Sequence, residues 1–357
     1  RLRSRRVCVL AYIMLKSEPM HRTLVSATPE NIGKEVIISG WVNARRNMGK
    51  IVFLDIRDRS GLAQVVGVPG ELSDVDKEKL KEIRPEWVVE IRGVVNERAR
   101  LLLESEPRSR GPARQGEKQK NPNQPGGLVE VLAKSISVLA TAEPLPLDLA
   151  DEKIGLDVYL DHLPITLRTE RAREIFKVQE TIIQAFREAL LREQFTEFQC
   201  PVLAGGDAEG GAATFRVDYF YNQSAYLATS PQLYKQIMTG VYERVFTTAK
   251  VFRGEKSATT RHLSEITQMD FEMGFITDQF DVMAMLEQVI KHIVSRVVEK
   301  HSDVLKRRGV AAPLLPEKFP VLKLREVHDI LGVAPESDVS PDQERAICEW
   351  AVEKHNS

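Results

Sequence analysis

The alternation of apolar and polar residues predicts a β-rich first part of the chain. Runs with a period of two recur between residues 36 and 139, and turns that contain Gly or Asp separate them. These runs cover residues 36–42, 51–58, 62–67, 88–95 and 128–139. One helical stretch, residues 74–83, lies among them. Five short strands with a single helix predict a small closed β-barrel of the OB type.

The pattern changes to that of helices after residue 140. Two prolines in residues 140–149 break regular structure, and we expect a linker over residues 140–165. An apolar stripe then predicts a long helix over residues 171–193, followed by a strand that ends at Pro201. A second stripe predicts another long helix, with Asp278 as its N-terminal cap. The whole pattern favours the α+β class, with an antiparallel sheet flanked by helices after the barrel.

The length and composition of the chain predict two domains, and the charge is distributed unevenly between them. A chain of 357 residues that is 43% hydrophobic can bury two cores, and we expect domains at residues 21–139 and 166–357. Residues 1–139 contain 25 Lys or Arg against 17 Asp or Glu, whereas the remainder contains 25 against 34. The basic first domain suggests an anionic partner, although a small excess of charge is often only a solvated surface.

The cysteines and the hydropathy indicate the compartment. Cys8, Cys200 and Cys348 are scattered, without the spacing of metal ligands or an even disulfide set. A reducing compartment is therefore expected, which predicts a cytoplasmic protein. No apolar run approaches the length that spans a membrane, so no membrane partner is expected.

Residues 251–275 carry charges where a buried sheet should be apolar. At a period of two, Arg253 and Glu255 share one face of a predicted strand, and Asp270 and Glu272 share a face of the next. One such carboxylate is usually explained by a salt bridge or an exposed edge. The combination of residues suggests more, because a guanidinium can clamp a phosphate and a carboxylate can receive an ammonium group. The face is suited to binding a nucleotide and an amino group side by side.

Several motifs resemble those of class II aminoacyl-tRNA synthetases, and among these the aspartyl-tRNA synthetases of the archaeal-like branch. Phe252-Arg253-x-Glu255, followed by Arg261-His262, is similar to the second signature motif of the class. Other segments resemble the aspartyl branch and its anticodon-binding OB barrel: Glu209-Gly-Gly, Ser230-Pro-Gln-Leu-Tyr-Lys235, Thr267-Gln-Met-Asp270, Gly40-Trp41-Val42 and the run from Phe53 to Gly61. The motifs occur in the order that the family shows.

The resemblance implies a role for each matching residue. Arg253 is the implied catalytic residue, contacting the α-phosphate of ATP and the substrate carboxylate. The implied aspartate-binding residues are Glu209, Ser230, Gln232, Lys235, Arg253 and Asp270. The implied ATP-binding residues are Arg253, Glu255, Arg261, His262 and Leu263. Mg²⁺ is implied with ATP, but its ligands are expected beyond Ser357, and no metal site is expected within the chain.

For the barrel, the resemblance implies an anticodon-binding surface that includes Asn43, Arg45, Phe53 and Gln64. Asn43 falls where the family's barrel helps to decide whether tRNA(Asn) is also accepted, and it matches neither pattern, so this choice stays open. Arg46 and Arg57 are further basic candidates. Phe53 could equally belong to the core, and we expect Trp41 to pack in the barrel rather than to stack on RNA.

The implied function is ATP-dependent ligation of L-aspartate to tRNA(Asp), through aspartyl-adenylate, by a homodimer. Two alternatives remain open. One is an asparaginyl-tRNA synthetase, although Lys235 suits a carboxylate better than an amide; the other is a non-catalytic tRNA-binding paralogue. Nothing in residues 313–357 resembles the third, Gly-rich motif of the class. We therefore expect the chain to be incomplete at its C-terminus and inactive alone, with Met14 or Met20 as the natural start.

Overall fold

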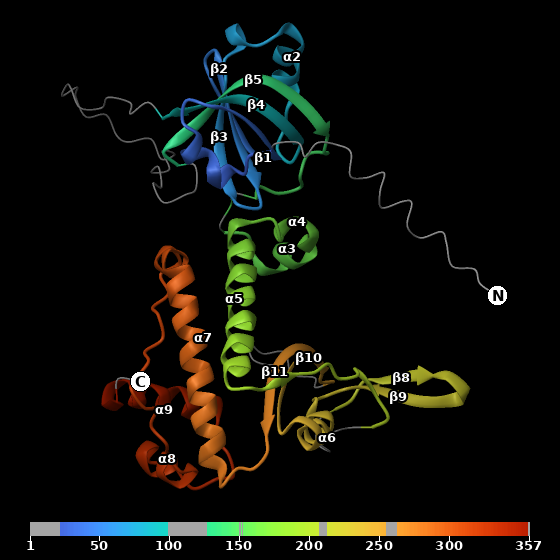
Figure 1. The fold of residues 1–357 in the computed structure, drawn as a ribbon, viewed down its shortest axis with the longest axis vertical. Coiled ribbons are helices and arrows are strands. Elements are labelled where there is room, and N and C mark those ends of the chain that lie inside the picture. The colour runs from blue at the N-terminus through green and yellow to red at the C-terminus, as the bar shows by residue number, and fades with distance from the viewer. Residues whose placement is uncertain are drawn as a thin grey trace. The chain divides into compact units, whose positions relative to one another are not determined.

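The computed structural model describes residues 22–98, 127–149, 151, 153–206, 213–254 and 263–355. The chain divides into two compact units, Arg1–Asp148 and Leu149–Ser357 (Figure 1). Within the residues described, no helix is both long and apolar enough to span a membrane.

The first unit is a closed barrel with the strand order β1-β2-β3-β5-β4, in which β4 pairs back onto β1. Its strands are β1 (Glu35–Met48), β2 (Ile51–Asp58), β3 (Gly61–Gly67), β4 (Val88–Glu97) and β5 (Val129–Ala140). Only the β3–β5 pair is parallel among these ladders. The 14 residues of β1 are enough to pair with both β2 and β4, which closes the sheet. The predicted OB-type barrel is confirmed.

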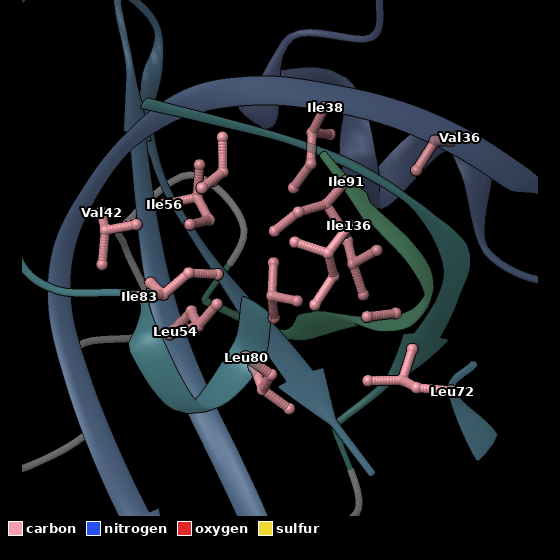
Figure 2. Packing of buried hydrophobic residues seen from close by; sticks show 14 of the residues in the cluster. Val36, Ile38, Val42, Leu54, Ile56, Leu72, Leu80, Ile83, Ile91 and Ile136 are labelled. Atoms are coloured by element: carbon pink, nitrogen blue, oxygen red, sulfur yellow. The ribbon is translucent and has the colours of Figure 1, made fainter. Parts of the chain in front are cut away.

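Alternate residues of the strands fill the barrel (Figure 2). In β2, Leu54 and Ile56 are fully buried. Gly40 is required in β1 because a Cβ atom there would lie 2.4 Å from the backbone oxygen of Arg57. Helix α2 (Asp74–Glu82) adds Leu80 to the core, and short 3₁₀ helices span Val25–Asn31 and Pro69–Glu71.

The second unit contains a three-stranded sheet with the order β11-β10-β6 and a smaller sheet with the order β7-β9-β8. The strands are β6 (Thr196–Glu197), β7 (Leu203–Ala204), β8 (Arg216–Tyr219), β9 (Gln223–Leu227), β10 (Arg244–Phe252) and β11 (Glu265–Met273). The helices are α3 (Leu156–Asp161), α4 (Leu163–Thr166), α5 (Glu170–Arg192), α6 (Gln232–Tyr242), α7 (Gln279–Arg308), α8 (Leu324–Leu331) and α9 (Pro341–His355), with a 3₁₀ turn at Phe220–Asn222.

The two long helices follow the prediction closely. Helix α5 begins after Thr169, whose side chain accepts a hydrogen bond from the backbone of Ala172. Helix α7 begins after Asp278, the predicted cap, which accepts from the Phe280 backbone at 2.8 Å. The strand expected to end at Pro201 is shorter than predicted, since β6 has only two residues.

Helices α5 and α7 pack along one another (Figure 1) and cover one face of the β10–β11 hairpin. The Phe186 ring lies 5.7 Å from that of Phe246, and the Phe195 ring lies 5.8 Å from that of Phe271, both edge to face. Since neighbouring residues of a strand point to opposite faces, Thr247 and Asp270 lie on the other face, which helix α6 contacts. The polar half of the hairpin is thereby separated from the core.

Candidate active site and nucleic-acid surface

Lys235, on the first turns of helix α6, is a buried cation facing the polar side of the hairpin. It is only 6% exposed. Its Nζ atom lies 3.3 Å from Oδ1 of Asp270 and 3.6 Å from Oε2 of Glu272. Burying an ammonium without a partner is costly, so these two carboxylates account for its position.

Several buried oxygens beside this lysine lack a hydrogen-bond partner among the described residues. They are Oδ2 of Asp270, Oε1 of Gln268 and Oγ1 of Thr247. Thr247 pairs with Asp270 across the hairpin, and Gln268 is two residues from Asp270, so all three lie on one face. A buried polar atom left unpaired costs about 1–3 kcal/mol. Such acceptors are expected where a ligand supplies donors, for instance an ammonium group.

The start of helix α6 brings two more of the predicted residues to this face. Ser230 is 4% exposed, and its Oγ atom accepts a hydrogen bond from the Gln232 backbone at 3.1 Å. Gln232 begins the helix and precedes Lys235 by three residues, which places both on one side of it. The structure therefore brings Lys235 and Asp270 together from two segments of the chain, and Ser230 and Gln232 belong to the same segment as Lys235.

Arg253 lies just beyond the end of β10 and not within it, contrary to the predicted strand. The chain still stays close to β11, because the Arg253 backbone N–H donates to Ser264 O at 3.0 Å. The next residue, Gly254, donates instead to Ala213 O at 2.6 Å. The strand ladder ends here, so the Arg253 side chain is not fixed by the period of the strand. Leu263 is 65% exposed.

Four predicted site residues lie outside the described residues: Glu209, Glu255, Arg261 and His262. As for metals, the described part of the chain contains no group of three or more His, Cys, Asp or Glu residues that could hold an ion.

Cys200 is a residue of this site that the sequence analysis missed. Burial raises the pKa of its thiol and the Asp270 carboxylate raises it further, while the Thr247 side chain acts against the shift. The thiol therefore lies near the same face as Lys235. Its signal in the sequence is only that it closely follows β6, the strand that pairs with β10.

On the barrel, polar residues form a row across the outer face of three strands. Asp55 of β2 pairs with Gln64 of β3, and Gln64 pairs with Glu130 of β5. The Gln64 side chain accepts from Arg46 at 3.4 Å and from Arg98 at 3.1 Å, and donates to Glu130 at 3.1 Å. The row presents both donors and acceptors, as a surface that recognises base edges does.

The charged side chains of this row interact with one another. Arg46 donates to Asp55 at 2.8 Å. Burial raises the pKa of Asp55 even though Arg46 and Arg98 act against the shift, and burial lowers the pKa of Arg98. Sequence analysis did not select Arg98 or Glu130, because only the folded barrel shows that both contact Gln64.

The remaining barrel predictions have mixed outcomes. Phe53 is half-buried on the outer face, since it alternates with the core residues Leu54 and Ile56. Arg45 is turned toward helix α2, donating to Leu80 O at 3.4 Å. The expectation for Trp41 was wrong: it is 43% exposed because the inward positions of β1 are the alternate ones, such as Val42.

Comparison with known proteins places both units in families. The model of class II tRNA synthetases (D, K and N) matches residues 156–357, and that of the OB-fold nucleic acid binding domain matches residues 36–109. The chain belongs to the class II tRNA synthetases. This membership confirms the recognition that the motifs suggested, and it makes the protein an enzyme of the aminoacyl-tRNA synthetase type.

Curated class II relatives include aspartate–tRNA ligases from bacteria and archaea. The aspartate–tRNA(Asp/Asn) ligase of Thermus thermophilus is 37% identical over 94% of this chain and 73% of the relative. The aspartate–tRNA(Asp/Asn) ligase of Methanocaldococcus jannaschii is 34% identical over 94% of this chain and 73% of the relative. The aspartate–tRNA(Asp) ligase of Thermococcus kodakarensis is 34% identical over 95% of this chain and 74% of the relative.

Solved class II synthetases share the fold. The asparaginyl-tRNA synthetase of Pyrococcus horikoshii, complexed with asparaginyl-adenylate, superposes with a TM-score of 0.77 at 31% identity, over 90% of this chain and 70% of that one. The aspartyl-tRNA synthetase of Entamoeba histolytica gives a TM-score of 0.72 at 25% identity, over 96% of this chain and 71% of that one. The predicted α+β fold class, a barrel followed by a synthetase sheet, is confirmed.

Proposed function

We propose that this protein ligates L-aspartate to tRNA(Asp) with ATP, through an aspartyl-adenylate intermediate. The observation that carries the proposal is the buried Lys235 ammonium, which faces two carboxylates and a set of unpaired acceptors. Such a site offers one cation for the substrate's side-chain carboxylate and oxygens for its ammonium group. The names of the relatives support the same substrate.

Within this site, Lys235 pairs with the side-chain carboxylate of aspartate. Asp270 receives the substrate ammonium through Oδ2, the oxygen that is not committed to the lysine. Ser230, Gln232 and Glu209 complete the amino-acid site. A neutral analogue such as asparagine is disfavoured because its amide is a weaker partner for the Lys235 ammonium than the charged side-chain carboxylate of aspartate.

The chemistry requires no nucleophile from the protein. The α-carboxylate of aspartate attacks the α-phosphorus of ATP, the bond to pyrophosphate breaks, and a hydroxyl of the terminal adenosine of tRNA then takes the aspartyl group from AMP. Arg253 clamps the α-phosphate and the attacking carboxylate, which positions both and stabilises the developing charge. Glu255 binds near the adenine, and Arg261, His262 and Leu263 lie near the nucleotide and its terminal phosphates. Mg²⁺, when bound with ATP, neutralises phosphate charge.

For tRNA, we propose that the barrel binds the anticodon loop. Phe53 supplies a half-buried aromatic ring, Gln64 supplies an amide, and Asn43 and Arg45 are further contacts. Acceptance of tRNA(Asn) as a second substrate is part of this proposal, because several relatives are named for both tRNAs. The exposed apolar residues Ile175 and Phe176 of helix α5 support a homodimer, and a role in translation supports a cytoplasmic location.

Amino-acid-dependent exchange of pyrophosphate into ATP by the full-length protein tests the proposal. We expect aspartate to drive the exchange at a kcat/KM at least about 100-fold above asparagine, since the two differ by one buried charge interaction. Exchange driven by asparagine would support an asparaginyl-tRNA synthetase, which the structural similarity to the Pyrococcus horikoshii enzyme makes the second candidate. No exchange with either amino acid would overturn the proposed activity.

A further inference from the structure

One hydroxyl group interrupts the apolar side chains that β10 presents to the face of the proposed amino-acid site. Four residues of this strand share that face and are buried: Val245, Thr247, Ala249 and Val251. Along β10, which the structure describes throughout, Thr247 is the one polar residue among the four. It is fully buried, with 0% of its surface exposed.

The Thr247 hydroxyl is not explained by packing. Its Oγ1 atom has no hydrogen-bond partner among the described residues. A buried hydroxyl without a partner lowers stability, whereas valine has nearly the same shape and carries no polar atom. Valine already occupies Val245 and Val251, two of the other positions on this face. The hydroxyl at residue 247 therefore needs a reason outside the core.

Thr247 lies opposite Asp270, the carboxylate that we propose receives the substrate ammonium. The two residues are direct partners in the antiparallel β10–β11 ladder. Directly opposed side chains have their Cβ atoms about 4.5–5.5 Å apart, which is close enough for a hydrogen bond between them. Oδ1 of Asp270 accepts from Lys235 at 3.3 Å, whereas Oδ2 is buried and has no partner in the described part of the chain. An unpaired donor and an unpaired acceptor thus occupy paired positions.

The thiol of Cys200 is the second neighbour of this hydroxyl. Burial and the Asp270 carboxylate raise the pKa of the thiol, and the Thr247 side chain acts against the shift. The thiol is therefore neutral near pH 7, and a neutral thiol is only a weak acceptor. A carboxylate is a stronger acceptor. Because a threonine hydroxyl has a single proton to donate, Asp270 is the preferred acceptor for it.

We propose that Thr247 is a positioning residue of the amino-acid site, whose hydroxyl donates to Oδ2 of Asp270 and aims this carboxylate at the substrate ammonium. The inference rests on the proposed function, because it takes aspartate to be the ligand of Asp270. A carboxylate oxygen accepts more than one hydrogen bond, so Oδ2 can hold the hydroxyl and the ammonium together. A change between staggered rotamers of Thr247 or Asp270 makes this contact.

Thr247→Val removes the hydroxyl with almost no change in shape, and Thr247→Ser keeps it. Thr248→Val is the matched control: in the described segments Thr248 also has a buried Oγ1 without a partner, but it lies on the opposite face of the same strand. Pyrophosphate exchange by each full-length variant gives KM for aspartate and for ATP. Inhibition by succinate, which has both carboxylates of aspartate but no ammonium group, is measured in the same assay.

We expect Thr247→Val to raise KM for aspartate roughly 5- to 20-fold, with little change in KM for ATP. The inhibition constant of succinate should also change little, because succinate has no ammonium for Asp270 to receive. Thr247→Ser should stay near the parent protein, and Thr248→Val should alter none of the three constants. The melting temperature of Thr247→Val should equal or exceed that of the parent, since the variant loses an unpaired buried hydroxyl.

A parent-like KM for aspartate in Thr247→Val would overturn the proposal. Equal weakening of aspartate and succinate, or no rescue by Thr247→Ser, would overturn it as well, because the side chain would then only support packing. If Thr247→Val does not fold, Thr247→Ala takes its place with the same expectations. The unsubstituted protein checks the proposed function separately: without aspartate-driven exchange there, the activity itself is wrong, whereas exchange that Thr247→Val leaves unchanged removes only the role of Thr247.

Discussion

The Nζ atom of Lys235 lies 3.3 Å from Oδ1 of Asp270, while Oδ2 of the same aspartate is buried without a partner in the described part of the chain. One carboxylate thus has one oxygen committed to a protein cation and the other available to a ligand. The lysine comes from a helix and the aspartate from a strand, 35 residues apart in the chain. A substrate with two carboxylates and one ammonium fits this division of charge.

Replacing Lys235 by Met should impair the use of aspartate much more than that of ATP. The variant removes the proposed charge-assisted contact to the substrate side chain, which is worth roughly 10- to 100-fold in KM for aspartate. KM for ATP should change little in the same exchange assay. Lys250→Met is the control, because Lys250 pairs with Glu265 at 3.2 Å on the surface of the same hairpin. An unchanged KM for aspartate would exclude Lys235 from the amino-acid site.

Arg253→Lys should reduce the rate of adenylate formation while leaving the protein folded. A point charge cannot make two parallel hydrogen bonds to a phosphate and a carboxylate, so kcat for pyrophosphate exchange should fall by about 100-fold or more. Arg325→Lys, at an exposed position of helix α8, is the matched control. Nearly full exchange activity of Arg253→Lys, measured with a thermal melt that matches the parent protein, would contradict the clamp.

Much of the fold was predictable because long elements repeat their pattern many times. Buried and less buried positions alternate along most of the ten residues of β4, and helix α5 repeats its apolar stripe over 23. In contrast, β6 and β7 have two residues each, too few to show a period. The expectation for Trp41 failed because a large aromatic residue in a strand does not reveal which face of the sheet it occupies.

The candidate site was predictable by motif but not by geometry. The sequence selected Lys235 and Asp270 separately, and only tertiary structure shows that they are paired. Cys200 had no signal, since proximity to Thr247 arises from the pairing of β6 with β10. The ion pair of Arg57 with Glu86 had no signal for the same reason, because the two residues are 29 apart in the chain and only the folded barrel brings them together.

Cys200 should react slowly with iodoacetamide at neutral pH. Burial raises the pKa of its thiol, and the nearby Asp270 carboxylate adds to the shift, so little thiolate is present. Cys348 is exposed and serves as the internal control. Peptide mass spectrometry should find Cys348 modified first, and saturating aspartate should slow Cys200 further. Equal rates at the two cysteines, or no effect of aspartate on Cys200, would contradict its assigned place beside the site.

His301 should make the second unit less stable as the pH falls. Burial lowers the pKa of His301, with nearby Lys300 and Lys177 acting in the same direction and Glu180 opposing them. Its ring nitrogen lies 2.8 Å from Oγ1 of Thr181 on helix α5. Because the folded-state pKa is below the unfolded value, the unfolded chain binds the proton more readily, so stability is full above about pH 6.5 and is lost as the pH falls below it.

Thermal melts between pH 5 and pH 8 should therefore show a smaller pH dependence for His301→Gln than for the parent protein, because glutamine keeps a hydrogen-bonding group but does not titrate. His355→Gln, at an exposed position of helix α9, should leave the pH dependence unchanged. A parent-like pH dependence in His301→Gln would show that other groups are responsible.

Removing the barrel should separate the two halves of the reaction. The chain forms two compact units that divide at Asp148 and Leu149, and the residues proposed to bind aspartate and ATP all lie in the second. A protein that lacks residues 1–148 but is otherwise full-length should therefore retain most aspartate-dependent pyrophosphate exchange but lose most aminoacylation of tRNA. In the full-length protein, tRNA binding should weaken steeply with added salt, because phosphate contacts release counterions. Equal loss of exchange and aminoacylation in a folded truncated protein would mean that the barrel supports the catalytic unit itself, and the assignment of tRNA binding to the barrel would then lose its basis.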